Sequence, residues 1–286
     1  MVFQDEEVGK YINQNFISLK INSRAGEGPA LREKYKVSAS PTVLFFSFDG
    51  MEIDRIVGFG GDRDGYLHTI QDYTRGRNTL QDYLTHLKND PDDIDMIMKV
   101  AEKYNDRGDL QTAVAYYKQI PSLDPDDENG YRSEVQFQIA VYELVDHANV
   151  LPMNNLLKSS AESENLNRGF NRLLRYYSNQ QDTLKVLETY EKAVAKLPDD
   201  ADMLNGYAWY IFQHKIQSKY AQGIVLARHA VKIAPKADAI WDTLGQLLFA
   251  DGQVQEAIDA MQKASDLAPD EPSYKENLEK YSKSLL

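Results

Sequence analysis

A regular spacing in the second half of the chain constrains its fold more than any other feature of the sequence. Pro269 follows Pro235 by 34 residues, and Pro235 follows Pro198 by 37. Before each proline, at matching offsets, stands a pair of small or β-branched residues: Ala257 and Ala264, Gly223 and Ala230, Val186 and Ala193, and, before Pro125, Ala113 and Ile120. Small residues let two helices approach closely, and proline ends a helix. The spacing therefore predicts stacked helical hairpins from about residue 91 onward.

The last unit of this series resembles the tetratricopeptide repeat. Its matching positions are Trp241, Leu244, Gly245, Leu248, Ala257, Ala264 and Pro269. The repeat length of about 34 residues is typical of that family. We place the extra residues between Pro198 and Pro235 in the segment 214–220, and we expect residues 131–163 to form a degenerate helix pair. Generic helical hairpins are the alternative interpretation.

A stack of such hairpins forms a concave groove lined by the first helix of each pair, so we expect a protein or peptide partner. The candidate groove residues are Glu102, Asn171, Arg175, Asn205, Trp209, Asp242, Gln246 and Phe249. For Trp209 and Phe249 the alternative is a place in the core between repeats. Some repeat domains hold a C-terminal carboxylate with lysine and asparagine at fixed positions, but Met98 and Glu102 stand there in this chain.

The first 77 residues alternate helix and strand patterns. Apolar residues at helical spacing, and proline or glycine at the ends, predict helices over 5–16, 28–37 and 64–76. Alternating or continuous apolar runs predict strands over 16–22, 42–46 and 52–59, with a hairpin turn at Asp49–Gly50 between the last two. Pro41 precedes the middle strand, where a proline is tolerated because it donates no ladder hydrogen bond.

These residues resemble the latter part of a thioredoxin-like domain over about residues 2–77. The motif Y-x-V-x-x-x-P-T-x-x-F, from Tyr35 to Phe45, is the main reason. The resemblance implies a cis Ser40–Pro41 bond and a loop of Ser40, Pro41 and Thr42 that offers its backbone to a substrate peptide. The predicted fold is thus an α/β partial thioredoxin-like domain (1–77), a connecting helix or linker (78–90) and an all-α superhelix of tetratricopeptide repeats (91–286).

A complete thioredoxin-like domain would begin earlier and would contain a WCxxC motif. This chain has no cysteine, which excludes disulfides, thiolate catalysis and dithiol exchange in it. We expect a truncated start; the alternative is a remnant that packs against the repeats or another chain. On this interpretation the full-length form is a thiol–disulfide oxidoreductase acting on protein clients, and the chain as given is a redox-inactive binding fragment. The alternative is a non-catalytic interaction scaffold or chaperone-type adaptor.

The net charge, the length of the apolar runs and the first residues indicate which partners and which cellular location to expect. The net charge of −12 argues against nucleic acid and anionic membrane surfaces. No apolar run is long enough to span a membrane, and the acidic start lacks the pattern of a signal peptide. The chain as written is therefore predicted to be cytoplasmic; a periplasmic or secreted location would follow from an upstream signal. The oligomeric state is left open.

Several motifs suggest cofactors and are rejected. The five histidines show no metal-binding spacing, and we expect each to be a lone residue on a helix face. In residues 58–61 the glycine pattern of a nucleotide loop fails because Arg63 stands at the last glycine position. In residues 124–130 the glycine comes one residue too late for a calcium loop. No cofactor or metal is expected, and Asp126, Asp199 and Asp270 are expected to cap helices.

Overall fold

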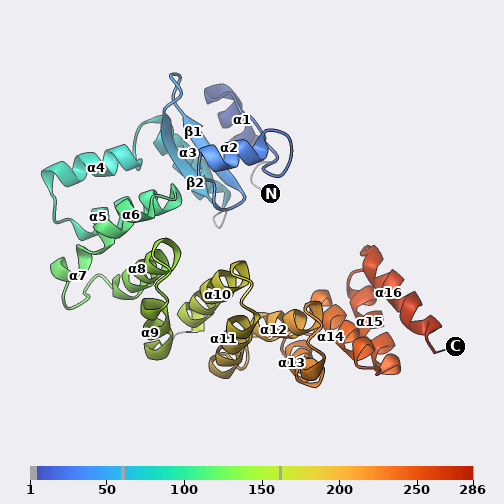
Figure 1. The fold of residues 1–286 in the computed structure, drawn as a ribbon. Coiled ribbons are helices and arrows are strands. Elements are labelled where there is room, and N and C mark those ends of the chain that lie inside the picture. The colour runs from blue at the N-terminus through green and yellow to red at the C-terminus, as the bar shows by residue number, and fades with distance from the viewer. Residues whose placement is uncertain (1–4, 59–61, 161–162, 286) are drawn as a thin grey trace. The chain divides into compact units, whose positions relative to one another are not determined.

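A computed structural model of the chain describes residues 5–58, 62–160 and 163–285 (Figure 1). Its internal contacts divide the chain into two compact units, Met1–Ala148 and Asn149–Leu286, and each is described by itself. The domain boundaries that the sequence suggests, after residues 77 and 90, stay a prediction.

The first unit combines a two-stranded sheet with helices. Strands β1 and β2 are antiparallel, with Thr42 opposite Val57. A small core of Val8, Phe45, Tyr66, Ile70 and Tyr73 joins β1 to two of the helices. The elements of this unit are α1 (Glu6–Asn15), α2 (Gly28–Lys34), β1 (Thr42–Phe46), β2 (Glu52–Val57), α3 (Arg63–Thr74), α4 (Leu80–Asn89), α5 (Ile94–Asp106), α6 (Leu110–Tyr117), α7 (Ile120–Leu123) and α8 (Arg132–Asp146).

The predicted α/β thioredoxin-like domain is wrong. In the described residues the sheet consists of β1 and β2 alone, and helices make up most of the chain (Figure 1). Residues 16–22, predicted as a strand, have no regular structure, and the side chains of Ile17 and Leu19 are 97% and 83% exposed. The alternation of apolar residues was a valid strand pattern, but this segment has no neighbouring strand to pair with. Without that pairing no face of the segment is buried.

The second unit consists of helical hairpins, and here the repeat frame is confirmed. Ala257 and Ala264 are fully buried, and a Cβ on Gly245 would lie 3.3 Å from the carbonyl oxygen of Ala257. The 3₁₀ helix η2 (Gln217–Lys219) occupies the predicted insertion. The helices are α9 (Leu151–Ser159), α10 (Ser163–Asn179), α11 (Thr183–Lys196), α12 (Ala201–Gln213), α13 (Tyr220–Ile233), α14 (Asp238–Ala250), α15 (Val254–Leu267) and α16 (Pro272–Lys283).

Other local predictions have mixed outcomes. Residues 131–163 contain two helices, α8 and α9, as predicted, but these belong to different units, and their packing as a pair stays a prediction. Two of the predicted acidic caps are one residue off: Asp200 caps α12 and Glu271 caps α16. The third, Asp126, caps no helix, because Tyr131 is the N-cap residue of α8; Asp124 instead accepts hydrogen bonds from the loop amides of Glu128 and Asn129. Phe59 to Gly61 of the glycine-rich turn lie outside the described residues. No helix in the described part of the chain has both the length and the apolar character needed to cross a membrane.

Candidate functional site

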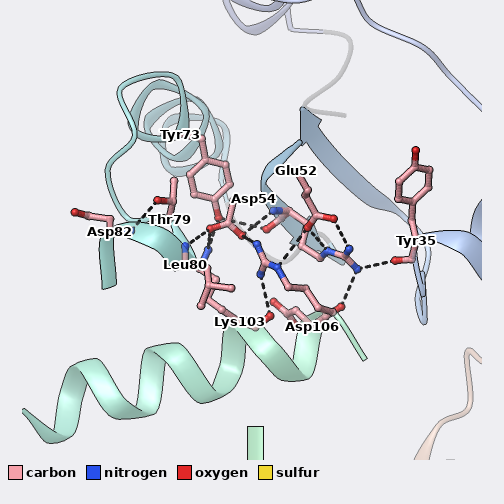
Figure 2. A network of polar contacts seen from close by, with 11 residues as sticks. Tyr35, Glu52, Asp54, Tyr73, Thr79, Leu80, Asp82, Lys103 and Asp106 are labelled. Carbon is pink, nitrogen blue, oxygen red and sulfur yellow. Dashed lines mark hydrogen bonds and ion pairs between the residues drawn. The ribbon is translucent and has the colours of Figure 1, made fainter. Parts of the chain in front are cut away.

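A buried carboxylate in β2 is the centre of the most extensive polar network in the first unit (Figure 2). Asp54 is completely buried, and its two oxygens lie 2.9 Å from the Nζ of Lys103 and 2.9 Å from an Nη of Arg107. The amide of Leu80 also donates to this carboxylate, at 2.9 Å. Lys103 lies in α5, the first helix of the predicted repeat region, and Arg107 is the residue that caps its C-terminal end. The network therefore ties the strand directly to that helix.

A second buried ion pair extends the network. Arg55 donates to both carboxylate oxygens of Glu52, at 2.7 and 2.6 Å. Its remaining nitrogen donates to the carbonyl oxygens of Tyr35, just after α2, and Asp106, at the end of α5. A bidentate guanidinium–carboxylate pair with its remaining donors satisfied is a rigid arrangement. The hairpin, the end of α2 and the end of α5 are thus fixed to one another.

Burial shifts the pKa values of two side chains in this network. Burial lowers the pKa of Lys103, and the nearby Asp54 carboxylate opposes that effect. Burial likewise raises the pKa of Tyr73, whose hydroxyl accepts from Lys103 at 2.7 Å and donates to the Arg55 carbonyl. Every cation named here faces a carboxylate or carbonyl of the protein itself. The arrangement positions elements and offers no free group for catalysis.

The Ser40–Pro41 peptide bond is cis, as predicted. Ser40 and Pro41 are exposed, and the hydroxyl of Thr42 donates to the Ala39 carbonyl at 2.8 Å. Arg32 donates to the carbonyl oxygens of Val37 and Ser38. Its side chain also lines an open depression of about 410 Å³ beside this loop. The role of Ser40, Pro41 and Thr42 in binding a substrate peptide stays a prediction, and it has no support from a thioredoxin-like fold.

The candidate groove residues are distributed over both units. Glu102 lies on α5 in the first unit, where desolvation raises the pKa of its carboxyl group. The others lie in the second unit, on the first helix of successive hairpins: Asn171 and Arg175 on α10, Asn205 and Trp209 on α12, and Asp242, Gln246 and Phe249 on α14.

The structure brings some of these residues into contact and separates others. Gln246 donates to both oxygens of Asp242, at 2.9 and 2.8 Å. Burial raises the pKa of that carboxyl group. The carbonyl oxygen of the Asn205 side chain is buried and has no hydrogen-bond partner within the described residues. Trp209 keeps 36% of its surface exposed, and its ring lies 5.5 Å from that of Phe212.

Phe249 is covered by the C-terminal helix. The ring of Tyr281 on α16 stacks on it at 4.0 Å, with an angle of 15° between the planes. Lys280 approaches the same ring at 5.4 Å. The alternative interpretation, a packed position, therefore describes Phe249 better than an open groove does. The helical spacing of Tyr274, Leu278 and Tyr281 is the sequence signal that could have identified this covering helix.

The hairpin of α14 and α15 has the length, the close-packed small residues and the terminal proline of the pattern described above. Residues 239–271 match the tetratricopeptide repeat family model. The chain thus contains a tetratricopeptide repeat, formed by α14 and α15. The pairs α10–α11 and α12–α13 precede this tetratricopeptide repeat in the same frame.

Solved structures with similar helical arrangements include YrrB, described as a TPR protein with an unusual peptide-binding site. It is 12% identical, with a TM-score of 0.46, and the match covers 68% of this chain and 96% of YrrB. Yeast Tom70 is 15% identical, with a TM-score of 0.47 over 71% of this chain and 42% of Tom70. The first TPR of Spaghetti (RPAP3), bound to the HSP90 peptide SRMEEVD, is 20% identical, with a TM-score of 0.38. That match covers 44% of this chain and 95% of the RPAP3 chain. At TM-scores below 0.5 these similarities say nothing about function. No curated protein matches the chain.

One side-chain cluster outside the tetratricopeptide repeat has donors suited to a metal. His86 and Asp90, at the end of α4, and Asp93, which caps α5, place their ligand atoms within 4.8 Å of one another. His86 was expected to be a lone residue on a helix face, and nothing in its spacing predicts this proximity. However, His86 already bonds Asp93 at 2.8 Å, and Asp93 accepts from the amide of Met96. The cap on α5 and the contact with His86 account for the position of the Asp93 side chain.

Proposed function

We propose that the second unit is a protein-interaction module that binds an extended peptide of a partner protein along α10, α12 and α14. The observation that supports this most directly is the half-exposed indole of Trp209, on the first helix of a hairpin adjacent to the tetratricopeptide repeat. Tryptophan is enriched among the residues that contribute most to binding energy at protein interfaces.

The packing of the helices supports the same proposal. Each first helix packs against its second helix, and α12 also packs against α14. Helix α10 is joined to the start of α12 by the hydrogen bond from Asn167 to Asp200. In the repeat frame, Arg175, Trp209 and Gln246 occupy equivalent positions on α10, α12 and α14. Polar and aromatic side chains at equivalent positions of successive first helices suit an extended chain, which needs hydrogen bonds and an apolar anchor.

Thiol–disulfide chemistry is not supported. The chain has no cysteine, and the predicted thioredoxin-like domain is wrong. Of the two functions that the sequence suggests, the non-catalytic interaction module agrees better with the repeat match at residues 239–271.

A peptide-library selection tests the proposal. The full chain is immobilised, binders are selected from a random-peptide library, and their dissociation constants are measured by fluorescence anisotropy. Trp209→Ala should weaken the selected peptides at least about tenfold, because a hot-spot residue contributes about 2 kcal/mol or more. Trp241→Phe is the control: Trp241 donates to the Pro235 carbonyl in the turn before α14 and has no assigned binding role. No selected peptides, or peptides insensitive to Trp209→Ala, would refute the proposal.

A further inference from the structure

Three arginines form one stripe on α10. Arg168, Arg172 and Arg175 are separated by four and three residues, so their side chains follow one another along the same face of the helix. Arg168 and Arg175 both lie close enough to Arg172 for their positive charges to lower its pKa. We call these three residues the α10 arginine stripe. Of the three, only Arg175 was a candidate groove residue from the sequence.

The neighbours of α10 show where the stripe lies. Asn167 donates to Asp200 at the start of α12, and a Cβ on Gly169 would touch the side chain of Leu157 on α9. The apolar face of α10 is buried, with Phe170, Leu173 and Leu174 all 6% exposed or less. Residues 172 and 175 are exposed. The stripe therefore lies on the face of α10 opposite its buried side, where the proposed peptide would run.

Two arginines of the stripe, Arg172 and Arg175, have no counter-charge among the described residues. Partial desolvation of the guanidinium of Arg172, a residue that is exposed as a whole, and its two arginine neighbours lower its pKa. Within the described residues, neither Arg172 nor Arg175 pairs with a carboxylate. Glu164 is the only acidic residue of α10, and it lies one turn before Arg168, at the far end of the stripe from Arg175. In a chain of net charge −12, the two neighbouring unpaired cations Arg172 and Arg175 have the chemistry to attract an external anion.

We propose that the α10 arginine stripe binds a run of aspartate and glutamate side chains in the partner peptide, an inference that rests on the peptide-binding function proposed above. From Arg168 to Arg175 the helix rises about 10 Å, at about 1.5 Å per residue. An extended peptide covers that length with about three residues, at about 3.3 Å each. The stripe therefore lies along about three peptide residues, and its two unpaired arginines, Arg172 and Arg175, can each bond a separate carboxylate of such a run.

The test compares two peptides that differ only in charge. The probes are dye-labelled Glu-Glu-Glu-Glu-Gly-Phe-Phe and its counterpart with four glutamines, both acetylated and amidated so that no terminal carboxylate is present. Anisotropy titrations of the full chain should show at least about tenfold tighter binding of the glutamate peptide, since hydrogen bonds between a guanidinium and a carboxylate are stronger than those to a neutral amide. The preference should weaken as salt is added.

Two double variants with the same charge change locate the site. Arg172→Gln with Arg175→Gln should abolish the preference for the glutamate peptide. Lys185→Gln with Lys192→Gln, which removes two exposed cations from α11, should retain it. Circular dichroism checks that both variants are folded.

The outcomes separate this inference from the function on which it rests. If the library yields peptides but the glutamate and glutamine probes bind equally, or the arginine variant keeps the preference, the inference is wrong and the peptide-binding function stands. Binding that appears only with a free C-terminal carboxylate, or only when phosphoserine replaces glutamate, also contradicts it. If the library yields no peptides, the proposed function itself fails.

Discussion

At the scale of single residues, the side chains that join α5 to the β-hairpin were hidden from sequence reasoning. Asp54 meets Lys103 and Arg107, about fifty residues away in the chain. Such pairs leave no local spacing to recognise. The one available clue was the pair Asp54–Arg55 between Ile53 and Ile56 in a predicted strand, because buried charges are almost always paired.

Replacing Asp54 with asparagine should therefore destabilise the protein strongly. The substitution leaves Lys103 and Arg107 without their buried counter-charge, and removal of one partner from a buried ion pair costs about 3–5 kcal/mol of unfolding free energy. Urea denaturation followed by circular dichroism measures the change. Glu188→Gln is the matched control, because it breaks the exposed pair with Lys185 and should cost about 0–1 kcal/mol. Equal effects of the two substitutions would show that the Asp54 network does not stabilise the fold.

A second prediction concerns Asp242, whose pKa burial raises above the ordinary value of 3.8. Above pH 3.8 the folded state then holds more protons at this site than the unfolded state. The contribution of Asp242 to the unfolding free energy therefore falls as pH rises through the window between the unfolded and the folded pKa. Asp242→Asn should remove this decline, so that its stability relative to the wild type improves as pH rises.

Urea denaturation at a series of pH values from below 3.8 upward measures this difference. The chain offers a close control in Asp259, which also accepts a hydrogen bond from a glutamine four residues away but is exposed on α15. If Asp259→Asn reproduces the pH dependence seen with Asp242→Asn, burial of Asp242 is not its cause.

At the scale of helices and strands, predictions from local chemistry succeeded and predictions that needed a distant partner failed. Proline at the hairpin ends and small residues at the contacts fixed the repeat helices, because both act within a few residues. Residues 16–22 alternate as a strand should, yet they form none, because a strand requires a neighbour that this sequence pattern does not specify. The predicted cap of α12 failed by a single residue: Asp199 and Asp200 are equally good candidates in the sequence, and only the structure places Asp200 at the start of α12.

The contact between α14 and α15 allows a direct test of the repeat frame. Ala257 is fully buried, close to Gly245. Ala257→Leu should overpack this contact and lower the unfolding free energy by about 1–3 kcal/mol. Gln255→Leu introduces the same side chain two residues earlier, at an exposed position of α15, and should change stability by about 0.5 kcal/mol or less. Thermal and urea denaturation of both variants measure the difference; a neutral Ala257→Leu would place the helix contact elsewhere.

At the scale of the whole molecule, the sequence predicted the repeating hairpins. It did not predict the helix that covers the last hairpin, or that this helix would cover one of the candidate binding residues. Phe249 was a candidate for peptide contact, and the structure assigns it to the contact with α16. Repeat arrays need a terminal element because the last hairpin otherwise exposes the apolar surface that an additional repeat would cover. Tyr274 and Tyr281 on α16 are 7% and 3% exposed, and the hydroxyl of Tyr274 donates to Asp238 at 2.8 Å.

Helix α16 should therefore act as the cap of the hairpin array. A chain lacking residues 271–286 loses two buried aromatic side chains at about 1.5–3 kcal/mol each, so its unfolding free energy should fall by roughly 3–6 kcal/mol. The newly exposed surface of α14 and α15 should also cause self-association, measurable by sedimentation velocity. A chain lacking only residues 284–286 is the control, because α16 remains complete. If the shorter chain stays as stable and as monodisperse as this control, α14 and α15 do not need α16 as a cap, and the ring of Phe249 is then available to a ligand.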